Sequence, residues 1–211
     1  APLGTVSSRF VLASGTLVPG GSYVVTATGT ARGGASGAAR KAGFARTTIV
    51  VNRPPSGGSC AVTPPSTAPI DRCAPCSSCA APSADGSSPA KGCALSTKFV
   101  VSCGGWSDDT DTKLTYSFGY LVGIPGALDG RPCSLADVAA VPPRCIAATI
   151  QARGAKSSKT TVLPAGNVTV VATVSDSSGG TVQRTMAVVT SDPTAGMDRA
   201  QKATYAKGLA D

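Results

Sequence analysis

The sequence predicts an all-β protein with the layout of a β-sandwich, and three observations favour this class. The 211 residues include 25 glycines and 16 prolines, which divide the chain into short segments and disfavour long helices. Eight cysteines and no histidine are typical of disulfide-linked domains in an oxidising, extracellular compartment. Several short stretches alternate apolar and polar residues, as strands with one buried face do.

The first two predicted strands lie near the N-terminus. A Pro-Gly-Gly turn precedes a strand within 17–30, in which Tyr23, Val25 and Ala27 share one face. The glycine-rich, basic segment 33–43 has no phosphate-loop spacing, so we interpret it as a flexible hairpin connection. The second strand, 46–51, ends at the sequence N-R-P-P.

This pair of strands recurs near the C-terminus. Residues 162–176 align with the first strand when Pro164 is placed on Pro19, an offset of 145 residues. Residues 184–193 align with 46–55 at an offset of 138. The repeat predicts one complete module at 53–192, preceded by the C-terminal strands of another module at 1–52.

Alternation predicts four more strands inside the complete module, at 99–103, 114–122, 145–151 and 159–163. An acidic turn at 108–111 joins the first two of them. The remaining segment, 193–211, is alanine-rich and has helical propensity from about 197 to 209, so it is expected to form a linker or a short docking helix.

Four motifs together resemble the REJ (receptor for egg jelly) region of polycystin-type proteins. They are P-P-S-G-G-S-C at 54–60, S-T-K-F-V-V-S-C-G-G-W-S-D-D at 96–109, L-T-Y-S-F-G-Y at 114–120 and L-P-A-G at 163–166. The resemblance covers roughly 45–192, and 17–51 more weakly. It implies immunoglobulin-like modules related to PKD domains, stacked in the extracellular stalk of a cell-surface or ciliary membrane protein.

The resemblance also implies a non-enzymatic role in adhesion, protein–protein assembly and mechanical spacing, with neighbouring modules or other extracellular proteins as partners. The chain departs from the family pattern at three places. A Cys-rich insertion is expected at 61–97, the segment 132–145 is expanded, and Val168 stands where a tyrosine is usual.

All eight cysteines are expected in disulfides. The family pattern has a cysteine at both Cys60 and Cys103, so the resemblance implies that these two pair. Cys133 and Cys145 bracket a proline-containing loop and suit a local bridge. The insertion holds the other four, with three possible connectivities: Cys73, Cys76, Cys79 and Cys93. Its C-A-P-C-S-S-C spacing leaves an iron–sulfur or zinc site as the alternative, although Ser83 stands where a fourth cluster ligand is expected.

Other residues are candidates for binding or modification. Asn167 begins an N-glycosylation sequon, Asn-Val-Thr, at an exposed corner. Trp106 is expected to pack over the bridge between Cys60 and Cys103, with a surface ligand role as the alternative. An acidic cluster could bind calcium, or it could be a solvated turn, because its spacing matches no EF-hand loop: Asp108, Asp109 and Asp111, with Asp176 as a further ligand.

The formal net charge is +8, but the basic residues are scattered, which favours a soluble basic surface. The alternative is a glycan-binding module for anionic sugars. Its candidate residues are Arg32, Arg40, Lys41 and Arg46. Scattered charge and an extracellular setting argue against nucleic acid. No apolar run approaches the roughly 18 residues of a membrane span, and no secretory leader pattern begins the chain, so a piece of a larger secreted or membrane-anchored protein is expected.

An enzyme is not predicted. The lack of histidine removes the Ser-His-Asp and Cys-His mechanisms, and there is no G-x-S-x-G or phosphate-loop motif. The only acidic cluster lies on a turn, where it forms no cleft for paired carboxylates. No catalytic residue and, calcium aside, no cofactor is expected.

Overall fold

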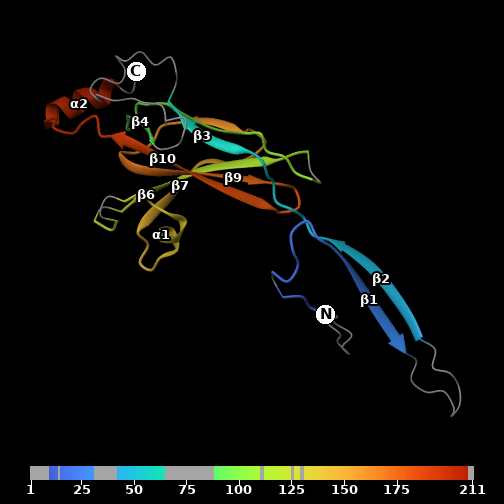
Figure 1. Ribbon diagram of the computed structural model, residues 1–211. Coiled ribbons are helices and arrows are strands. Elements are labelled where there is room, and N and C mark those ends of the chain that lie inside the picture. Colours follow the sequence, from blue (N-terminus) through green and yellow to red (C-terminus); the bar gives the residue numbers. More distant parts are fainter. Residues whose placement is uncertain are drawn as a thin grey trace, which may run out of the picture. The chain divides into compact units, whose positions relative to one another are not determined.

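The computed structural model describes residues 10–13, 15–30, 42–64, 88–109, 112–124, 126–128 and 131–208 (Figure 1). The chain divides into two compact units, Ala1–Pro54 and Pro55–Asp211. Both are built mainly of β-strands, which confirms the predicted all-β class.

The first unit contains an antiparallel hairpin of β1, Ser22–Thr30, and β2, Ala42–Val50. Both predicted strands are present, although β2 begins four residues earlier than the sequence suggested. Tyr23 pairs with Ile49 across the hairpin. A turn precedes β1, in which the Gly21 N–H donates to the Val18 carbonyl at 3.0 Å; Gly20 adopts a left-handed φ of 76° there, which glycine tolerates without strain.

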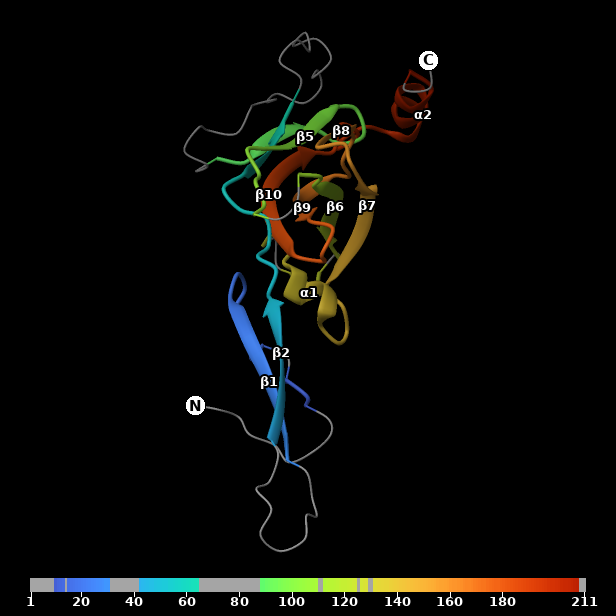
Figure 2. The same cartoon turned by 90° about the vertical axis from the view of Figure 1, so that its right-hand side faces the viewer.

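The second unit contains two sheets, seen as stacked layers in Figure 2. The three-stranded sheet has the order β3–β5–β8 and is fully antiparallel: Ser59–Thr63, Phe99–Gly104 and Ser158–Thr161. The five-stranded sheet has the order β4–β10–β9–β6–β7: Ala90–Cys93, Thr181–Ser191, Gly166–Ser175, Thr115–Gly123 and Cys145–Gly154. Only β4 and β10 pair in parallel in this sheet.

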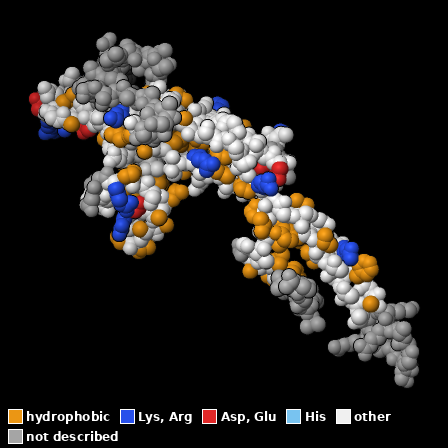
Figure 3. Space-filling view, viewed as in Figure 1, with side chains coloured by type: hydrophobic (Ala, Val, Ile, Leu, Met, Phe, Trp, Pro, Cys, Tyr) orange, Lys and Arg blue, Asp and Glu red, His pale blue; other side chains and the backbone are white. Residues whose placement is uncertain are grey.

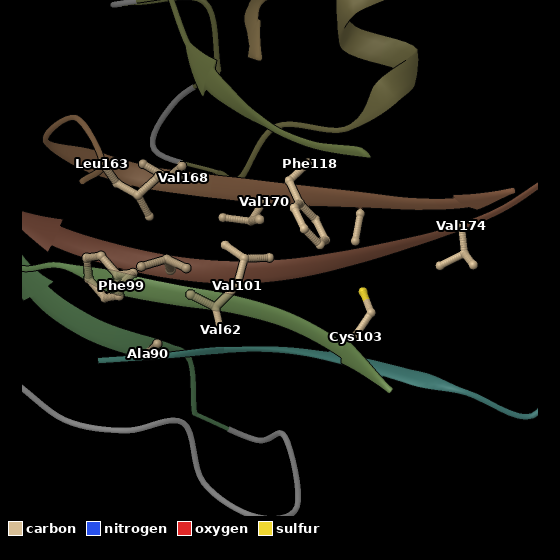
Figure 4. Packing of buried hydrophobic residues seen from close by; sticks show 12 residues of the cluster. Val62, Ala90, Phe99, Val101, Cys103, Phe118, Leu163, Val168, Val170 and Val174 are labelled. Atoms are coloured by element: carbon tan, nitrogen blue, oxygen red, sulfur yellow. The ribbon is translucent and has the colours of Figure 1, made fainter. Parts of the chain in front are cut away.

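The main core lies between these two sheets (Figure 4). It consists of alternate residues from each layer, because successive side chains of a strand point to opposite faces. The five-stranded sheet contributes Phe118, Val168, Val170, Ala172, Val174 and Val188, and the three-stranded sheet contributes Val62, Phe99, Val101 and Cys103. Phe99 and Phe118 are its largest side chains, and both are almost fully buried.

A second, smaller core lies on the opposite face of the five-stranded sheet. Leu121 and Val171 are buried there beneath the segment between β6 and β7. That segment contains the short helix α1, Leu135–Ala139, which the sequence analysis did not predict. The five-stranded sheet is therefore covered on both faces over part of its length.

Two strands lie inside the expected insertion at 61–97. Ala61–Thr63 belongs to β3, where Val62 is 2% exposed, and Ala90–Cys93 forms β4, where Ala90 is 1% exposed. Both ends of the expected insertion therefore belong to strands of the sandwich. The connection between these two strands is the segment from Thr63 to Ala90, which is shorter than the predicted insertion. The sequence A-K-G-C has no β-branched or aromatic residue, so β4 carries no strand signal; pairing with β10 and burial hold it in place.

The strand register corrects the sequence alignment of the two hairpins. Thr30 pairs with Ala42 in the first unit, and Ser175 pairs with Thr181 in the second. The offset of 145 from β1 to β9 therefore implies an offset of 139 from β2 to β10, where matching of Arg and Thr residues suggested 138. One residue matters, because a shift by one exchanges the two faces of a strand.

The C-terminal segment forms α2, Arg199–Gly208, within the range of the expected helical propensity. Reciprocal hydrogen bonds cap its start: the Gln201 N–H donates to the Asp198 carboxylate at 2.8 Å, and the Asp198 N–H donates to the Gln201 side-chain carbonyl at 2.9 Å. The cap satisfies backbone donors that have no partner inside the helix.

Candidate interaction surfaces

The bridge between Cys60 and Cys103 lies where the chain enters the second unit. The two residues are directly opposite each other in the β3–β5 register, with their Cα atoms 4.1 Å apart. The pairing implied by the family resemblance is confirmed. This disulfide joins neighbouring strands of one sheet, so it ties the first strand of the unit to the sheet and leaves the contact between the two sheets to the apolar core.

Trp106 covers the edge of the main core next to this bridge. A side chain at position 58 would overlap its indole ring, so the ring lies directly against Gly58 and only a glycine leaves room for it. The guanidinium of Arg184 lies 5.2 Å from the ring centroid, a cation–π distance. The expected packing against the core is confirmed, whereas contact with the disulfide itself stays a prediction. The role of Arg184 carried no sequence signal, because it arises from a strand 78 residues away in the chain.

The second core is fastened by the predicted bridge between Cys133 and Cys145, which is confirmed. Both cysteines are buried, and the Thr169 hydroxyl donates to the Cys133 carbonyl at 2.8 Å. This bond ties the β6–β7 segment to the middle of the sheet. The bridge therefore holds a folded cap in place over the outer face of the sheet.

Asp137 organises the cap from the first turn of α1. Arg131 donates two hydrogen bonds to its carboxylate, at 2.6 and 3.0 Å, and the Ser134 N–H donates a third at 3.0 Å. The Ser134 hydroxyl also bonds the carboxylate and caps the helix. Mainly through the hydrogen bonds from Arg131, then those from Ser134, these contacts hold the pKa of Asp137 well below its usual range. The sequence S-x-x-D at 134–137 is typical of a helix capping box, so the start of α1 could have been predicted from it.

Cys93, the last of the four insertion cysteines, is disulfide-bonded and fully buried. The other three, Cys73, Cys76 and Cys79, lie outside the described residues, so their connectivity and the iron–sulfur or zinc alternative are not addressed. The connecting segment leaves from β3 in one sheet and returns at β4 in the other. It is attached to both layers of the sandwich.

The acidic residues have separate surroundings where the structure describes them. Asp176 is fully buried, and its carboxylate accepts a hydrogen bond from the Gly180 N–H at 2.8 Å across the β9–β10 turn. Its carbonyl accepts one from Arg153 at 2.7 Å. Within the described ranges, no group of three or more His, Cys, Asp or Glu side chains comes together. Asp111 is outside those ranges, and the calcium site with Asp108 and Asp109 stays a prediction.

The proposed glycan and modification residues are described in part. Asn167 is exposed as the second residue of β9. Arg46 is exposed on β2, with its guanidinium 5.6 Å from the ring centroid of Phe44. Arg32, Arg40 and Lys41 are not among the described residues. Of the four candidate glycan-binding residues, the structure therefore describes one, an exposed arginine beside an exposed aromatic ring.

These features define the class as a disulfide-stabilised β-sandwich module of the extracellular type. A family model described as the REJ domain matches residues 3–207, so the match spans both units. The chain belongs to the REJ domain family, a family of structural modules from polycystin-type extracellular regions. Comparison with curated proteins and with solved structures gives no match. In the part that the structure describes, no helix has the length and apolarity needed to cross a membrane.

Proposed function

We propose that the chain is a structural and adhesion segment of a cell-surface or ciliary protein, and that it spaces and assembles neighbouring extracellular modules under load. One observation carries this proposal. The disulfide between Cys60 and Cys103 is placed at the entry strand of the second unit, five residues after Pro55. The covalent bond therefore stands in the path that tension takes into the sandwich.

The path can be followed through the second unit. A pull on the chain before Pro55 first meets the backbone pair between Ser56 and Ser107. It then reaches β3, where the disulfide transfers it at Cys60 to Cys103 on β5. The chain between these two cysteines is bypassed, because a disulfide does not extend under forces that unfold domains. Load then passes from Cys103 along the chain to β6, whose Phe118 belongs to the main core. The connecting segment is therefore protected from stretching.

The length held back by the bridge gives a measurable signature. The cysteines are 43 residues apart in sequence and 4.1 Å apart in space at their Cα atoms. A fully extended residue spans about 3.5 Å, so removal of the bridge would release up to about 150 Å of chain. The disulfide of Cys93 lies within the bypassed segment and would shorten this value as long as it stays closed.

Single-molecule force spectroscopy on the full chain tests the proposal. The oxidised chain is expected to unfold its second unit in one cooperative rupture, and a variant with Cys60→Ala and Cys103→Ala is expected to gain up to about 150 Å of contour length. A variant with Val141→Ala, a fully exposed position, serves as the control without extra length. Gradual extension of the oxidised chain without a rupture peak would argue against a load-bearing role.

The glycan-binding alternative is favoured by one observation, the exposed Arg46 beside the exposed ring of Phe44. Planar sugar faces pack on such rings, and sulfate or carboxylate groups pair with arginine. Retention on a sulfated-glycan column that falls steeply with salt, and is lost with Arg46→Gln and Phe44→Ser together, would support it. No retention at low salt would exclude it.

A further inference from the structure

The β1–β2 hairpin has the same register as the hairpin at the centre of the five-stranded sheet. Tyr23 pairs with Ile49 as Val168 pairs with Val188, and the correspondence continues along both strands. In the second unit this hairpin is paired further on both sides, with β6 beside β9 and β4 beside β10. Among the described residues, β1 and β2 pair only with each other. In the described part of the first unit, both edges of the hairpin are therefore open at positions that are filled in the second unit.

The apolar residues of the two hairpins differ in burial accordingly. Val188 is 1% exposed, whereas its counterpart Ile49 is 36% exposed. Val170 is fully buried, whereas its counterpart Val25 is only half-buried. Further apolar side chains are exposed along both strands: Val24, Phe44 and Val50. Figure 3 shows hydrophobic side chains on the surface of this hairpin. A two-stranded hairpin with this much exposed apolar surface is at best marginally stable alone.

A specific hydrogen bond indicates the kind of structure to which the hairpin belongs. The Val18 N–H donates to the Tyr23 hydroxyl at 2.8 Å, so the tyrosine is tied to the backbone five residues before it. In immunoglobulin-type sandwiches a tyrosine near the start of the sixth strand makes such a bond to the upstream backbone. The second unit has Val168 at this position and therefore has no tyrosine hydroxyl to accept such a bond. The first hairpin therefore contains a tyrosine corner, a feature of immunoglobulin-type sandwiches.

The backbone alternation identifies the groups that are free on the open edge of β1. The Val51 N–H donates to the Gly21 carbonyl at 2.9 Å, so Gly21 belongs to a hydrogen-bonded pair. In an antiparallel ladder such pairs recur at every second residue, and the residues between them direct their N–H and C=O groups away from the partner strand. Along β1 these outward-facing residues are Val24, Thr26 and Thr28.

The second unit shows which strand fits there. Thr169, Val171 and Thr173 of β9 correspond to these outward-facing residues, and they lie opposite β6. Side chains of β6 alternate so that the large ones reach the core, and Phe118 stands opposite Ala172. Ala27 and Gly29 of β1 correspond to Ala172 and Val174 of β9. The side chains at these two positions of β1 are therefore no larger than those of β9, and they leave room for large side chains on an added strand.

We propose that the open edge of β1 binds, antiparallel, an extended polypeptide strand from outside these 211 residues that has large apolar side chains at alternate positions. This is strand addition, in which backbone hydrogen bonds give affinity and alternate side chains give specificity. The occupant is a strand of the β6 kind, and its large residues lie over Val25, Ala27 and Gly29. The inference concerns the first unit and is independent of the load-bearing role proposed for the second.

The test uses the full chain and a fluorescent peptide with the sequence of β6, T-Y-S-F-G-Y-L-V-G. A control peptide has serine in place of the residues that correspond to Tyr116, Phe118 and Tyr120. Fluorescence anisotropy is expected to show binding of the first peptide only. Thr26→Pro removes an outward-facing N–H without removing a β1–β2 hydrogen bond and should weaken binding by about tenfold or more. Thr26→Ala should leave it within about threefold.

Amide hydrogen exchange gives an independent readout on the unmodified chain. Saturation with the β6 peptide should slow exchange more at Val24, Thr26 and Thr28, whose amides face away from β2, than at Tyr23 and Val25, whose amides already face β2 and gain only from the added stability of the hairpin. Equal peptide binding by Thr26→Pro and Thr26→Ala, or unaltered exchange at the three outward-facing amides, would overturn the proposal. Protection of these amides in a concentration-dependent dimer without peptide would show that a second copy fills the edge, which would overturn the choice of occupant.

Discussion

Loss of the bridge between Cys133 and Cys145 should destabilise the second unit by an amount that the loop length determines. The cysteines are 12 residues apart, and the chain-entropy model gives about 3 kcal/mol for a loop of that size. For a unit of this size, each 1 kcal/mol shifts the melting temperature by about 2–4 °C. We therefore expect the double variant Cys133→Ala with Cys145→Ala to melt about 6–12 °C lower.

The measurement can use the one tryptophan of the chain. Trp106 lies in the second unit, packed against its core, so its fluorescence during denaturant unfolding reports on that unit. The matched control is Val141→Ala, which lies in the same loop, is almost fully exposed and should change the free energy of unfolding by less than about 0.5 kcal/mol. A loss below about 1 kcal/mol in the double variant would refute the view that the bridge holds a folded cap on the sheet.

Three further predictions concern the second unit. Phe118→Ala empties the centre of the main core and should cost about 3–5 kcal/mol in the free energy of unfolding, measured by urea denaturation; a cost below about 1 kcal/mol would contradict the assigned packing. The pKa of Asp137 is lower in the folded than in the unfolded chain, so its contribution to stability is fully present at neutral pH. This contribution begins to fall as the pH drops below the usual carboxyl pKa near 4 and is lost as the pH falls through the lower pKa of the folded state. Asp137→Asn should flatten the pH dependence of the melting temperature between pH 5 and the acid limit, and an unchanged profile would refute the assignment. Expression through a eukaryotic secretory pathway should attach a glycan at Asn167, detected as a mass loss on enzymatic deglycosylation that Asn167→Gln abolishes; an unmodified asparagine would contradict it.

The strands that the sequence predicted are those whose residues carry both signals, alternation and β-propensity. In β6 and β9, most residues at every second position are branched or aromatic, such as Phe118 and Val170, so one buried face could be recognised from the pattern alone. The disulfides between Cys60 and Cys103 and between Cys133 and Cys145 were equally accessible, through the family pattern and through the spacing of the two cysteines around a short loop.

The remaining features depend on contacts between distant residues. Nothing in A-K-G-C indicates a strand, because β4 exists only through its pairing with β10. The second core was missed because alternation was interpreted as one buried face, whereas Leu121 and Val171 are buried on the other. Arg184 was matched to Arg46 by residue identity, while the strand register places it one residue away. Pairing and burial, which no local pattern encodes, decide these cases.

The position of the connecting segment between Thr63 and Ala90 has a consequence for its length. Its two ends belong to β3 and β4, which are fixed in different sheets, so the segment can lengthen or shorten without any change in the register of either strand. The entropic cost of a longer flexible loop grows only with the logarithm of its length, by about 0.6 kcal/mol for each doubling. Homologous chains can therefore carry very different sequences at this place on the same sandwich, as antibodies do on theirs.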